Sequence, residues 1–581
     1  MPDLLSAVIF LPAIGALLLA FLPKEEETNL KAAAIAITLA TFCLSLGLLM
    51  RFDLRSSAMQ LGVSAEWIPS FGIRYQTGLD GVSLPLVLLT TFLMPVTLLG
   101  AWSSITTRVR EFVIAMCALE SGMLGAFAAL DLFLFYVFWE AMLIPMYLLI
   151  GIWGGKRRIF AAVKFFLFTF AGSILMLVAI LYVAQQANGS WDFSLDAALK
   201  QSFAASTQKW LFAAFALAFA IKVPMFPVHT WLPDAHTEAP TPGSVILAGV
   251  LLKLGVYGFI RFAYPLFPQA ALDASPLIAW LAVAGIMYGA VAAWVQPDMK
   301  KLVAYSSVSH LGFCVLGVTA MTVEGVSGSV YQMVAHGLST GGLFLLVGVL
   351  YERRHTRLLA DYGGIARKVP TFTFFFVFTA LASAGLPALS GFPGEFLILL
   401  GTFTSGFPLN AQVAIPGLGT IQLAHMQTFF AATGVILAAV YLLWMVQKVL
   451  FGPLQNPANE KLEDMGLREV VVMLPLVVLM LVLGVAPGRL IDTIQPSAKA
   501  FVESVHKRGT GREYKPDFGA KRIASAVPVI GGEIRPQLKV APNDLRQKLM
   551  RGGPVTGGPV TGDGPIRIER VAPSEVPGGG P

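Results

Sequence analysis

Runs of about 20 mostly apolar residues follow one another along nearly the whole chain, separated by short polar connections. A helix of that length crosses the hydrocarbon core of a bilayer, and backbone polar groups find no water there, so each run is expected to be helical. A mean hydropathy of +0.72, with 56% hydrophobic and 13% charged residues, excludes an ordinary soluble domain of 581 residues. The sequence therefore predicts an all-α polytopic membrane protein.

The apolar runs predict about 14 transmembrane helices. The first run lacks a basic segment before it and a small-residue cleavage site after it, so we expect it to remain as a helix. The expected spans lie near 4–22, 30–50, 80–102, 112–130, 132–153, 162–185, 209–228, 242–263, 276–296, 301–321, 326–350, 371–401, 423–450 and 470–492.

The connections between the spans differ in charge. One alternate set carries most of the loop Lys and Arg residues, so it is expected on the cytoplasmic side. An even number of spans then places both termini on the other side. The net charge of +7 is explained by this bias and by the basic tail, so no nucleic-acid partner is implied. Residues of the basic set include Lys156, Arg157, Arg158, Lys300, Lys301, Arg353, Arg354, Arg357, Arg367 and Lys368.

The composition changes near residue 505 to Gly, Pro, Lys and Arg, with the near-repeat GGPVTGGPVTGDGP. Such a segment lacks the apolar side chains that a folded core needs. We expect a disordered tail over 505–581. It either orders along a partner subunit or is a dispensable extension.

Several ionisable side chains interrupt the apolar runs. A charge at the bilayer centre costs about 2.5–3.5 kcal/mol even on lenient scales, so such residues are candidates for function. Acids, lysines and histidines in successive spans predict movement of protons or another cation across the membrane. The candidate relay consists of Glu140, Lys222, Lys253, His310, His336 and Glu395.

Two apolar runs also contain helix breakers beside these charges. IKVPMFP places Pro224 and Pro227 just after Lys222, and proline removes backbone donors from a helix. SAGLPALSGFPGEF concentrates Gly and Pro residues before Glu395 in the same way. Interrupted segments at corresponding positions in two halves of a transporter often mark the ion path. The chain is thus expected to contain an inverted repeat.

Lys222 and Glu140 are predicted to form a switchable pair. Burial disfavours the ammonium, whereas a nearby carboxylate favours it, so the proton affinity of Lys222 depends on its separation from Glu140. The alternative is a static salt bridge that only orients helices.

Lys253 is expected to be the central relay, between Gly249 and Gly255, which leave space for water or for close helix approach. The alternative is a lysine that extends to the interface. His310 and His336 lie in consecutive helices and can exchange protons near neutral pH, unless they are satisfied core histidines. Glu395 would be the terminal acceptor, with helix packing as the alternative.

Other polar residues have weaker assignments. His229 and His236 in HTWLPDAH are expected either to line an entry path or to anchor their loop. Glu120 and Asp131 are expected near helix ends, facing an interface or a neighbouring subunit. Lys448 is interpreted as a loop charge that could extend the relay.

Several long motifs also carry a family resemblance. FWEAMLIPMY, KVPMFPVHTWLPDAHTEAPTPGSVILAGVLLKLGVYG, QPDMKKLVAYSSVSHLGF, MVAHGLSTGGLFLLVGVLYERRHTR and GFPGEFLIL resemble the M-type antiporter-like subunit of respiratory complex I over residues 1–495. An acid at Glu395 resembles the M-type rather than its L-type and N-type sisters. The lack of an apparent long amphipathic helix after the last span argues in the same direction.

The resemblance implies 14 helices, with two inverted five-helix repeats and broken seventh and twelfth helices. The implied parts are helices 1–3 over 1–110, a first repeat over 111–265, a second repeat over 270–452 and a last transmembrane helix within 453–495. The location implied is an energy-transducing membrane, the bacterial inner (plasma) membrane.

The resemblance further implies a translocating subunit of NADH:quinone oxidoreductase without a redox centre of its own. Cys43, Cys117 and Cys314 lack metal-ligand spacing, and no nucleotide-binding glycine pattern is present. NADH, FMN, iron–sulfur clusters and quinone are then expected on partner subunits, beside L-type and N-type neighbours. The alternatives are an Mrp-type Na⁺/H⁺ antiporter subunit and a structural membrane subunit with vestigial charges.

Overall fold

The structure is a computed structural model that describes residues 3–186, 191–415 and 419–514. Twelve helices among these residues are long and apolar enough to cross a membrane. They are α1 (Leu4–Phe21), α2 (Glu27–Arg51), α3 (Ser83–Gly100), α4 (Val109–Ala128), the pair α5 (Leu132–Ala141) and α6 (Leu143–Trp153), α7 (Arg158–Gln185), the segment Thr241–Leu266, α14 (Pro268–Trp294), α15 (Met299–Thr319), α16 (Val323–Arg354), α19 (Leu423–Leu450) and α20 (Leu467–Val485).

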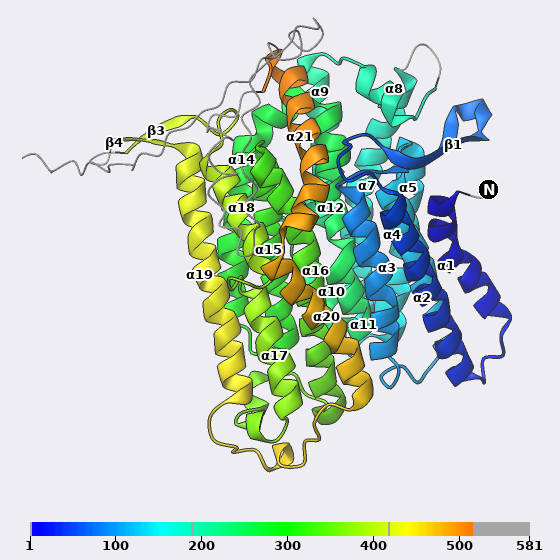
Figure 1. The fold of residues 1–581 in the computed structure, drawn as a ribbon, viewed down its shortest axis with the longest axis vertical. Coiled ribbons are helices and arrows are strands. Elements are labelled where there is room, and N and C mark those ends of the chain that lie inside the picture. Colours follow the sequence, from blue (N-terminus) through cyan, green and yellow to red (C-terminus); the bar gives the residue numbers. More distant parts are fainter. Residues whose placement is uncertain (1–2, 187–190, 416–418, 515–581) are drawn as a thin grey trace, which may run out of the picture. The chain divides into compact units, whose positions relative to one another are not determined.

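These helices run side by side in one bundle (Figure 1). The prediction of an all-α polytopic membrane protein is confirmed. Helix α16 is buried along most of its length and contacts α3, α15, α17, α18, α20 and α21. Small residues on α16, such as Gly328, Gly337 and Gly342, let these neighbours approach closely.

The two interrupted segments are those that the sequence predicts. Helix α9 (Ala205–Lys222) is separated from α10 (Trp231–Glu238) by the stretch that holds Pro224 and Pro227. Helix α17 (Pro370–Ser383) is separated from α18 (Gly391–Phe403) by the stretch that holds Gly385 and Pro387. Added to the twelve long helices, these two segments agree with the expected 14, but the total, the inverted repeats and the implied domain limits stay predictions.

The segment Thr241–Leu266 has an irregularity that was not predicted. It consists of α11 (Thr241–Ile246), the π-helical turn η2 (Leu247–Leu251), α12 (Lys253–Gly258), a second π-helical turn η3 (Phe259–Ala263) and α13 (Tyr264–Leu266). Single π-helical turns widen a helix locally and often occur at functional sites. Here they lie directly before Lys253 and around Arg261.

Small strands and short helices complete the fold. Strands β1 (Gln60–Ile68) and β2 (Ile73–Leu79) form an antiparallel hairpin, and β3 (Gln412–Ile415) pairs with β4 (Gly419–Gln422). The β1–β2 hairpin and α8 (Leu195–Lys200) lie at one end of the bundle, which we call the hairpin end (Figure 1). The 3₁₀ turns are η1 (Pro69–Phe71), η4 (Leu359–Asp361), η5 (Ile365–Arg367) and η6 (Pro457–Asn459).

The basic connections meet at the opposite end, which we call the basic end. There the Gly155 amide donates to the Glu238 carbonyl, and the Met299 amide donates to the Arg357 carbonyl, both at 2.9 Å. By the loop-charge rule, the basic end faces the cytoplasm. Ser6 at the start of α1 lies 2.7 Å from the Tyr75 hydroxyl of the hairpin, so the chain enters the bundle at the hairpin end.

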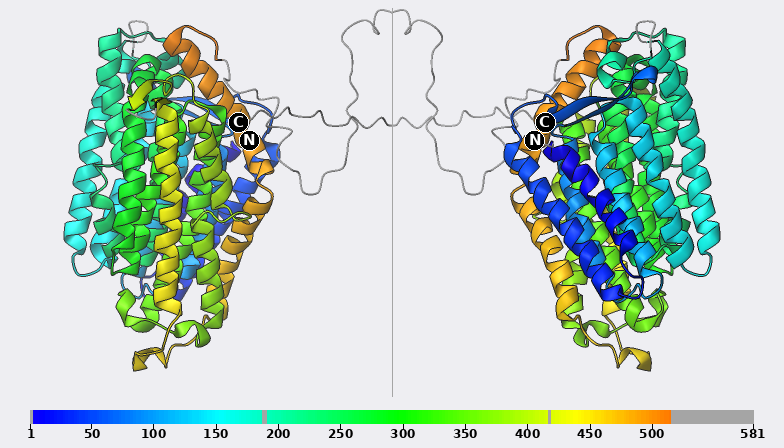
Figure 2. Two further views of the ribbon diagram at one scale, coloured as in Figure 1. Left: turned by 90° about the vertical axis from the view of Figure 1, so that its left-hand side faces the viewer. Right: turned by 90° about the vertical axis from the view of Figure 1, so that its right-hand side faces the viewer.

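The C-terminal boundary differs from the prediction. The last apolar helix ends at Val485, and a further helix, α21 (Gly488–Thr510), follows it across the bundle toward the hairpin end (Figure 2). Its buried side chains recur every three or four residues, including Ile494, Ala498, Phe501 and Val505, so one face packs and the other is polar.

Two expectations about this region are therefore wrong. The apolar helix expected near 470–492 ends at Val485, and an amphipathic helix does follow the final span. A hydropathy window misses such a helix because its polar face cancels its apolar face. Residues 505–510 belong to α21 rather than to the expected tail. From residue 515 onward the expected tail lies outside the described residues.

Candidate functional site

Lys253 lies at the first residue of α12, directly after the π-helical turn η2, and is fully buried. In an ordinary α-helix the Leu252 amide would donate to the Ala248 carbonyl. Here it donates to the Leu247 carbonyl at 3.3 Å, and the Lys253 ammonium donates to Ala248 instead. The widened turn thus supplies the buried ammonium with a backbone acceptor. The burial of Lys253 excludes the alternative interpretation, a lysine that extends to the interface.

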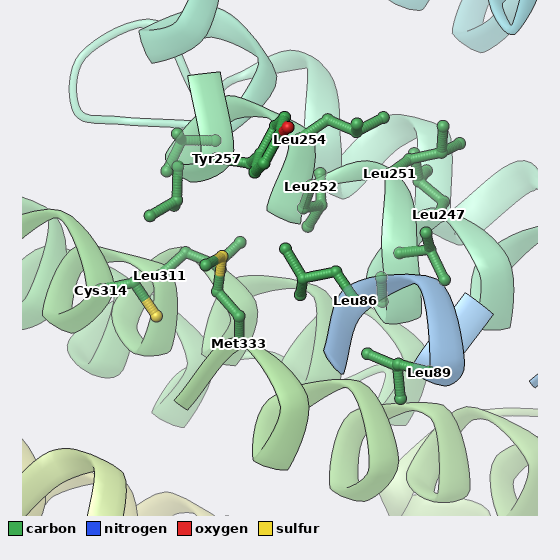
Figure 3. Packing of buried hydrophobic residues seen from close by; sticks show 14 of the residues in the cluster. Leu86, Leu89, Leu247, Leu251, Leu252, Leu254, Tyr257, Leu311, Cys314 and Met333 are labelled. Atoms are coloured by element: carbon green, nitrogen blue, oxygen red, sulfur yellow. The ribbon is translucent and has the colours of Figure 1, made fainter. Parts of the chain in front are cut away.

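Apolar side chains surround this turn. Leu247 and Leu251 lie on the side of Leu86 and Leu89 of α3, and Leu311, Cys314 and Met333 of α15 and α16 lie on the other side (Figure 3). An ammonium in such surroundings requires hydrogen-bond partners, because an unpaired buried charge is very costly. Lys253 finds its second partner on α16.

His336 of α16 is that partner. Its Nδ1 atom lies 2.8 Å from the Lys253 ammonium. The two helices approach closely at Gly337, where an added Cβ would lie 2.9 Å from the Gly249 carbonyl oxygen. The glycines beside Lys253 therefore serve close helix approach, which was one of the two expected roles.

Buried titratable side chains continue from His336 to Glu395, with a ring contact rather than a hydrogen bond between His336 and His310 among the described residues. The rings of His336 and His310 have centroids 5.6 Å apart. His310 Nδ1 lies 3.0 Å from Glu395 Oε1, and Tyr441 of α19 lies 3.2 Å from His310 Nε2. We call Lys253, His336, His310 and Glu395 the central relay. All four side chains are buried, and they come from α12, α16, α15 and α18.

Glu395 lies in the first turns of α18, just after the break in that helix pair. Its Oε1 atom also accepts a hydrogen bond from Gln332 Nε2 at 3.1 Å. Gly385, in the break, has φ +72°, and an added Cβ would lie 2.7 Å from Glu395 Oε2. The glycine in the break is therefore required both by the backbone and by the carboxylate.

We expect Gly385→Ala to impair proton translocation and to lower stability. The left-handed backbone alone costs an alanine about 1–2 kcal/mol, and the new methyl group would displace Glu395. Gly452→Ala is the matched control, because Gly452 has φ +97° and an added Cβ would meet no described atom within 4 Å apart from its chain neighbours. The midpoint temperature of thermal unfolding should fall in both variants, whereas the rate of proton translocation in reconstituted vesicles should fall only in Gly385→Ala. Equal translocation in the two variants would contradict this assignment.

Lys222 lies at the last residue of α9, where the helix breaks, and is buried. Its ammonium lies 4.7 Å from the centroid of the Trp139 ring, a cation–π contact. No described residue accepts a hydrogen bond from it.

Glu140 follows Trp139 on α5 and is half-buried. Its Oε1 atom is buried, and no described residue donates a hydrogen bond to it. Among the ion pairs of the described residues, all within 4.0 Å, none joins Glu140 to Lys222. The two groups still interact through space. The structure thus holds this pair apart, which is not the static salt bridge of the alternative interpretation.

Lys222 and the central relay belong to helices in direct contact. An added Cβ on Gly255 would lie 2.7 Å from the Phe219 carbonyl oxygen and 2.8 Å from the Val223 amide. The end of α9 therefore packs on α12 two residues from Lys253. The helices that carry the two lysines are thus in contact, without a direct hydrogen bond between the lysines among the described side chains.

A third group of polar residues lies between the central relay and the basic end. His236 of α10 is fully buried and stacks on Phe344 at 4.7 Å, and neither ring nitrogen has a partner among the described residues. The buried Lys300 ammonium donates to the Ala239 carbonyl. Glu238, Lys300 and Phe344 line a cavity of about 590 Å³ at this end. His229 instead packs on Tyr288, 4.9 Å between centroids, so an entry role is favoured for His236 only and stays a prediction.

Glu120 was assigned wrongly from the sequence. It lies in the middle of α4, fully buried, and no described residue hydrogen-bonds to either carboxyl oxygen. It therefore does not face an interface of this chain. Gly122 and Gly125 lie toward the other side of α4 and pack closely on Met142 and Phe138, so the helix is covered on both sides.

Asp131 and Lys448 have structural positions. Asp131 caps α5 by accepting from the Phe133 and Leu134 amides at 2.9 Å. Burial raises the pKa of Asp131 to about 6 against the opposing effect of these hydrogen bonds. Lys448 is exposed in the last turn of α19, at the basic end, as a loop charge would be. Tyr441 and Gln332 were not singled out from the sequence, because apolar or small neighbours conceal them.

Known proteins match this chain over most of its length. Residues 129–416 match the family described as NADH:quinone oxidoreductase/Mrp antiporter, TM. NADH-quinone oxidoreductase subunit M of Rhodobacter capsulatus is 45% identical over 520 residues, which cover 87% of this chain and 98% of that protein. The chain belongs to the subunit M family of NADH-quinone oxidoreductases. The resemblance inferred from the motifs is confirmed, and the chain is a multi-pass protein of the bacterial inner membrane.

Solved structures agree with this family. A chain of respiratory complex I from Thermus thermophilus with bound NADH has a TM-score of 0.77 at 34% identity, covering 86% of this chain and 99% of that one. A chain of the Mrp complex from a Dietzia species has a TM-score of 0.70 at 23% identity, covering 89% and 52%. The likeness to the Mrp chain extends to the fold alone. Within the described residues, no group of three or more His, Cys, Asp or Glu side chains is placed to hold a metal ion.

Proposed function

We propose that this chain is a proton-translocating membrane subunit of complex I, driven by quinone reduction in other subunits. The observation that carries the proposal is the central relay, in which Lys253 reaches Glu395 through two histidines across four buried helices. Each of these side chains carries a group that can bind and release a proton. A set of titratable groups in contact through an apolar core has no simple packing role.

Lys222 and Glu140 act as the switch that loads this relay. In the separated arrangement the Lys222 ammonium contacts the Trp139 ring, and Glu140 acts on it only through space. Approach of the Glu140 carboxylate would favour the charged lysine, and separation would favour release of its proton toward Lys253. Each 1.4 kcal/mol of difference between the two arrangements changes the proton affinity tenfold, so modest movements suffice.

The energy for this switching comes from outside the chain. Driving one charge against 100 mV requires about 2.3 kcal/mol. NADH oxidation would supply it through FMN, iron–sulfur clusters and quinone on partner subunits, so this chain needs no redox centre of its own. Large exposed apolar side chains on α1 and α7, such as Phe21 and Val178, fit contact with lipid or with L-type and N-type neighbours.

The complete complex carrying Glu140→Gln tests the proposal. The amide keeps the shape of the side chain but cannot become an anion, so Lys222 loses its switchable partner. After reconstitution in vesicles, we expect NADH-driven acidification to fall at least about tenfold, since a shift of one pKa unit already changes occupancy tenfold. Electron transfer should slow with it, because the two processes are coupled.

Glu460→Gln is the matched control, because Glu460 is exposed at the basic end. That variant should pump normally. Normal assembly of Glu140→Gln with both activities unchanged would remove Glu140 from the mechanism and favour the structural-subunit alternative. Sodium-driven proton exchange without NADH would instead favour the Mrp-type alternative.

A further inference from the structure

A cavity of about 460 Å³ lies at the hairpin end, between the β1–β2 hairpin, α8, α13 and α21. Part of its wall is exposed, including Ser57, Ser64 and Ser504, so it reaches the surface of the chain. Deeper in, the Gln76 and Thr77 side-chain oxygens have no partner among the described residues. A cavity of this size has room for several waters, since each occupies about 30 Å³, and these two oxygens can bind them.

The inner wall of this cavity includes a buried ion pair. Arg261 Nη2 lies 2.6 Å from Asp80 Oδ1, and both side chains are buried. Burial alone would raise the pKa of the Asp80 carboxyl, but the Arg261 charge and the hydrogen bonds from Arg261 and Ser83 hold it below its ordinary value. Asp80 also accepts from the Val82 and Ser83 amides at the start of α3. The carboxylate is thus fixed in place and remains charged.

Arg261 also reaches toward the central relay. Its Nε donates to the Tyr257 hydroxyl at 3.1 Å, and its guanidinium carbon lies 5.3 Å from the centroid of the Tyr257 ring. Tyr257 follows Lys253 by four residues in α12, so the two side chains share one face of the helix. A single tyrosine layer therefore separates the face of Lys253 from the guanidinium at the cavity wall.

This arrangement creates a hazard for a proton pump. A proton on Lys253 that crossed the tyrosine layer would reach the cavity at the hairpin end without passing His336, His310 or Glu395. Proton hopping needs groups that accept one proton and donate another. The Tyr257 hydroxyl donates to the Phe127 carbonyl at 2.8 Å and accepts from Arg261, so both roles are occupied.

Arginine is suited to close such a route. The guanidinium has five N–H donors and no acceptor, and it stays protonated in proteins. It can neither take a proton from Tyr257 nor pass one to the cavity. A fixed positive charge at a constriction also opposes the entry of protons, as in other membrane pores.

We propose that Arg261, held by Asp80, is a seal that prevents protons on Lys253 from escaping through Tyr257 into the cavity at the hairpin end. The inference rests on the proposed role of Lys253 as a proton carrier. It adds a function for two charged residues outside the relay. It also explains why an ion pair, rather than apolar side chains with a lower desolvation cost, lies at the inner wall of this cavity.

The test measures passive proton leak in the absence of NADH. The complete complex carrying Arg261→Gln is reconstituted in vesicles, and a potassium diffusion potential drives protons inward. Glutamine is shorter and contains an acceptor oxygen, so the leak is expected to rise several-fold over the unmodified complex. Arg261→Lys retains a cation that only donates hydrogen bonds, so its proton leak should stay as low as that of the unmodified complex. A tight Arg261→Gln complex would overturn the proposal.

Double variants separate a leak through this route from general damage. Adding Tyr257→Phe or Lys253→Met to Arg261→Gln should restore a tight membrane, because each removes a step of the route. A leak that persists in both double variants would overturn the proposal. If Arg261→Gln does not assemble, Asp80→Asn replaces it, because it keeps an acceptor for Arg261 while loosening the pair. That variant should leak, and a tight Asp80→Asn complex would then count against the seal. Since no arm needs turnover, failure here is distinct from failure of the proposed pumping function.

Discussion

Lys253→Met is expected to stop proton translocation almost completely. Methionine fills nearly the same volume but carries no proton, so the contact with His336 Nδ1 at 2.8 Å is lost and the central relay is cut at its start. Without a group to carry the proton, moving its charge through this part of the membrane costs about 2.5–3.5 kcal/mol. An activation free energy raised by that amount slows translocation roughly a hundredfold. Acidification of reconstituted vesicles per NADH oxidised measures the effect.

Folding should tolerate Lys253→Met, because replacing a buried charge by an apolar side chain of similar size is often neutral or stabilising. Lys448→Met is the control, since Lys448 is exposed in the last turn of α19. It should leave translocation unchanged. Wild-type acidification by an assembled Lys253→Met complex would contradict the relay.

Glu395→Gln is expected to have a comparable effect at the other end of the relay. Glutamine keeps the shape, but it neither binds nor releases a proton, and it removes the anion 3.0 Å from His310 Nδ1. Translocation should fall at least about tenfold, because hydrogen bonds to charged groups are worth about 1.5–3 kcal/mol. The same vesicle assay measures it.

The conservative variant Glu395→Asp distinguishes chemistry from packing. Aspartate can still carry a proton, so it should recover part of the translocation that glutamine abolishes. Glu25→Gln, at an exposed residue before α2, serves as the control and should pump normally. If Glu395→Gln pumps normally, or if Glu395→Asp is no better than Glu395→Gln, the terminal acceptor role is wrong.

Most of the helices and all six relay candidates could be named from the sequence. The length of each apolar run is set by the thickness of the bilayer, and this constraint acts on each segment by itself. Likewise, an ionisable residue inside such a run is conspicuous whatever its neighbours are. The proline and glycine clusters after Lys222 and before Glu395 predicted both helix breaks for the same local reason.

The errors concern features that depend on neighbours. Helix α21 was missed because its polar face lowers its mean hydropathy, and only packing against α14 and α16 reveals its apolar face. Glu120 was placed at an interface because periodicity does not say which helix faces are covered by other helices. The π-helical turn before Lys253 has no sequence signal of its own that we recognised.

The sequence by itself determined the class of the protein, the segments that cross the membrane and the titratable residues within them, because these follow from hydrophobic length and from the cost of charge in lipid. Only the tertiary structure decided which of these residues meet. Lys253 reaches Glu395 through His336 and His310 because four helices pack at their glycines, whereas Lys222 rests on Trp139 and stands apart from Glu140. Contacts between side chains far apart in the chain depend on helix register and rotation, which no single segment encodes.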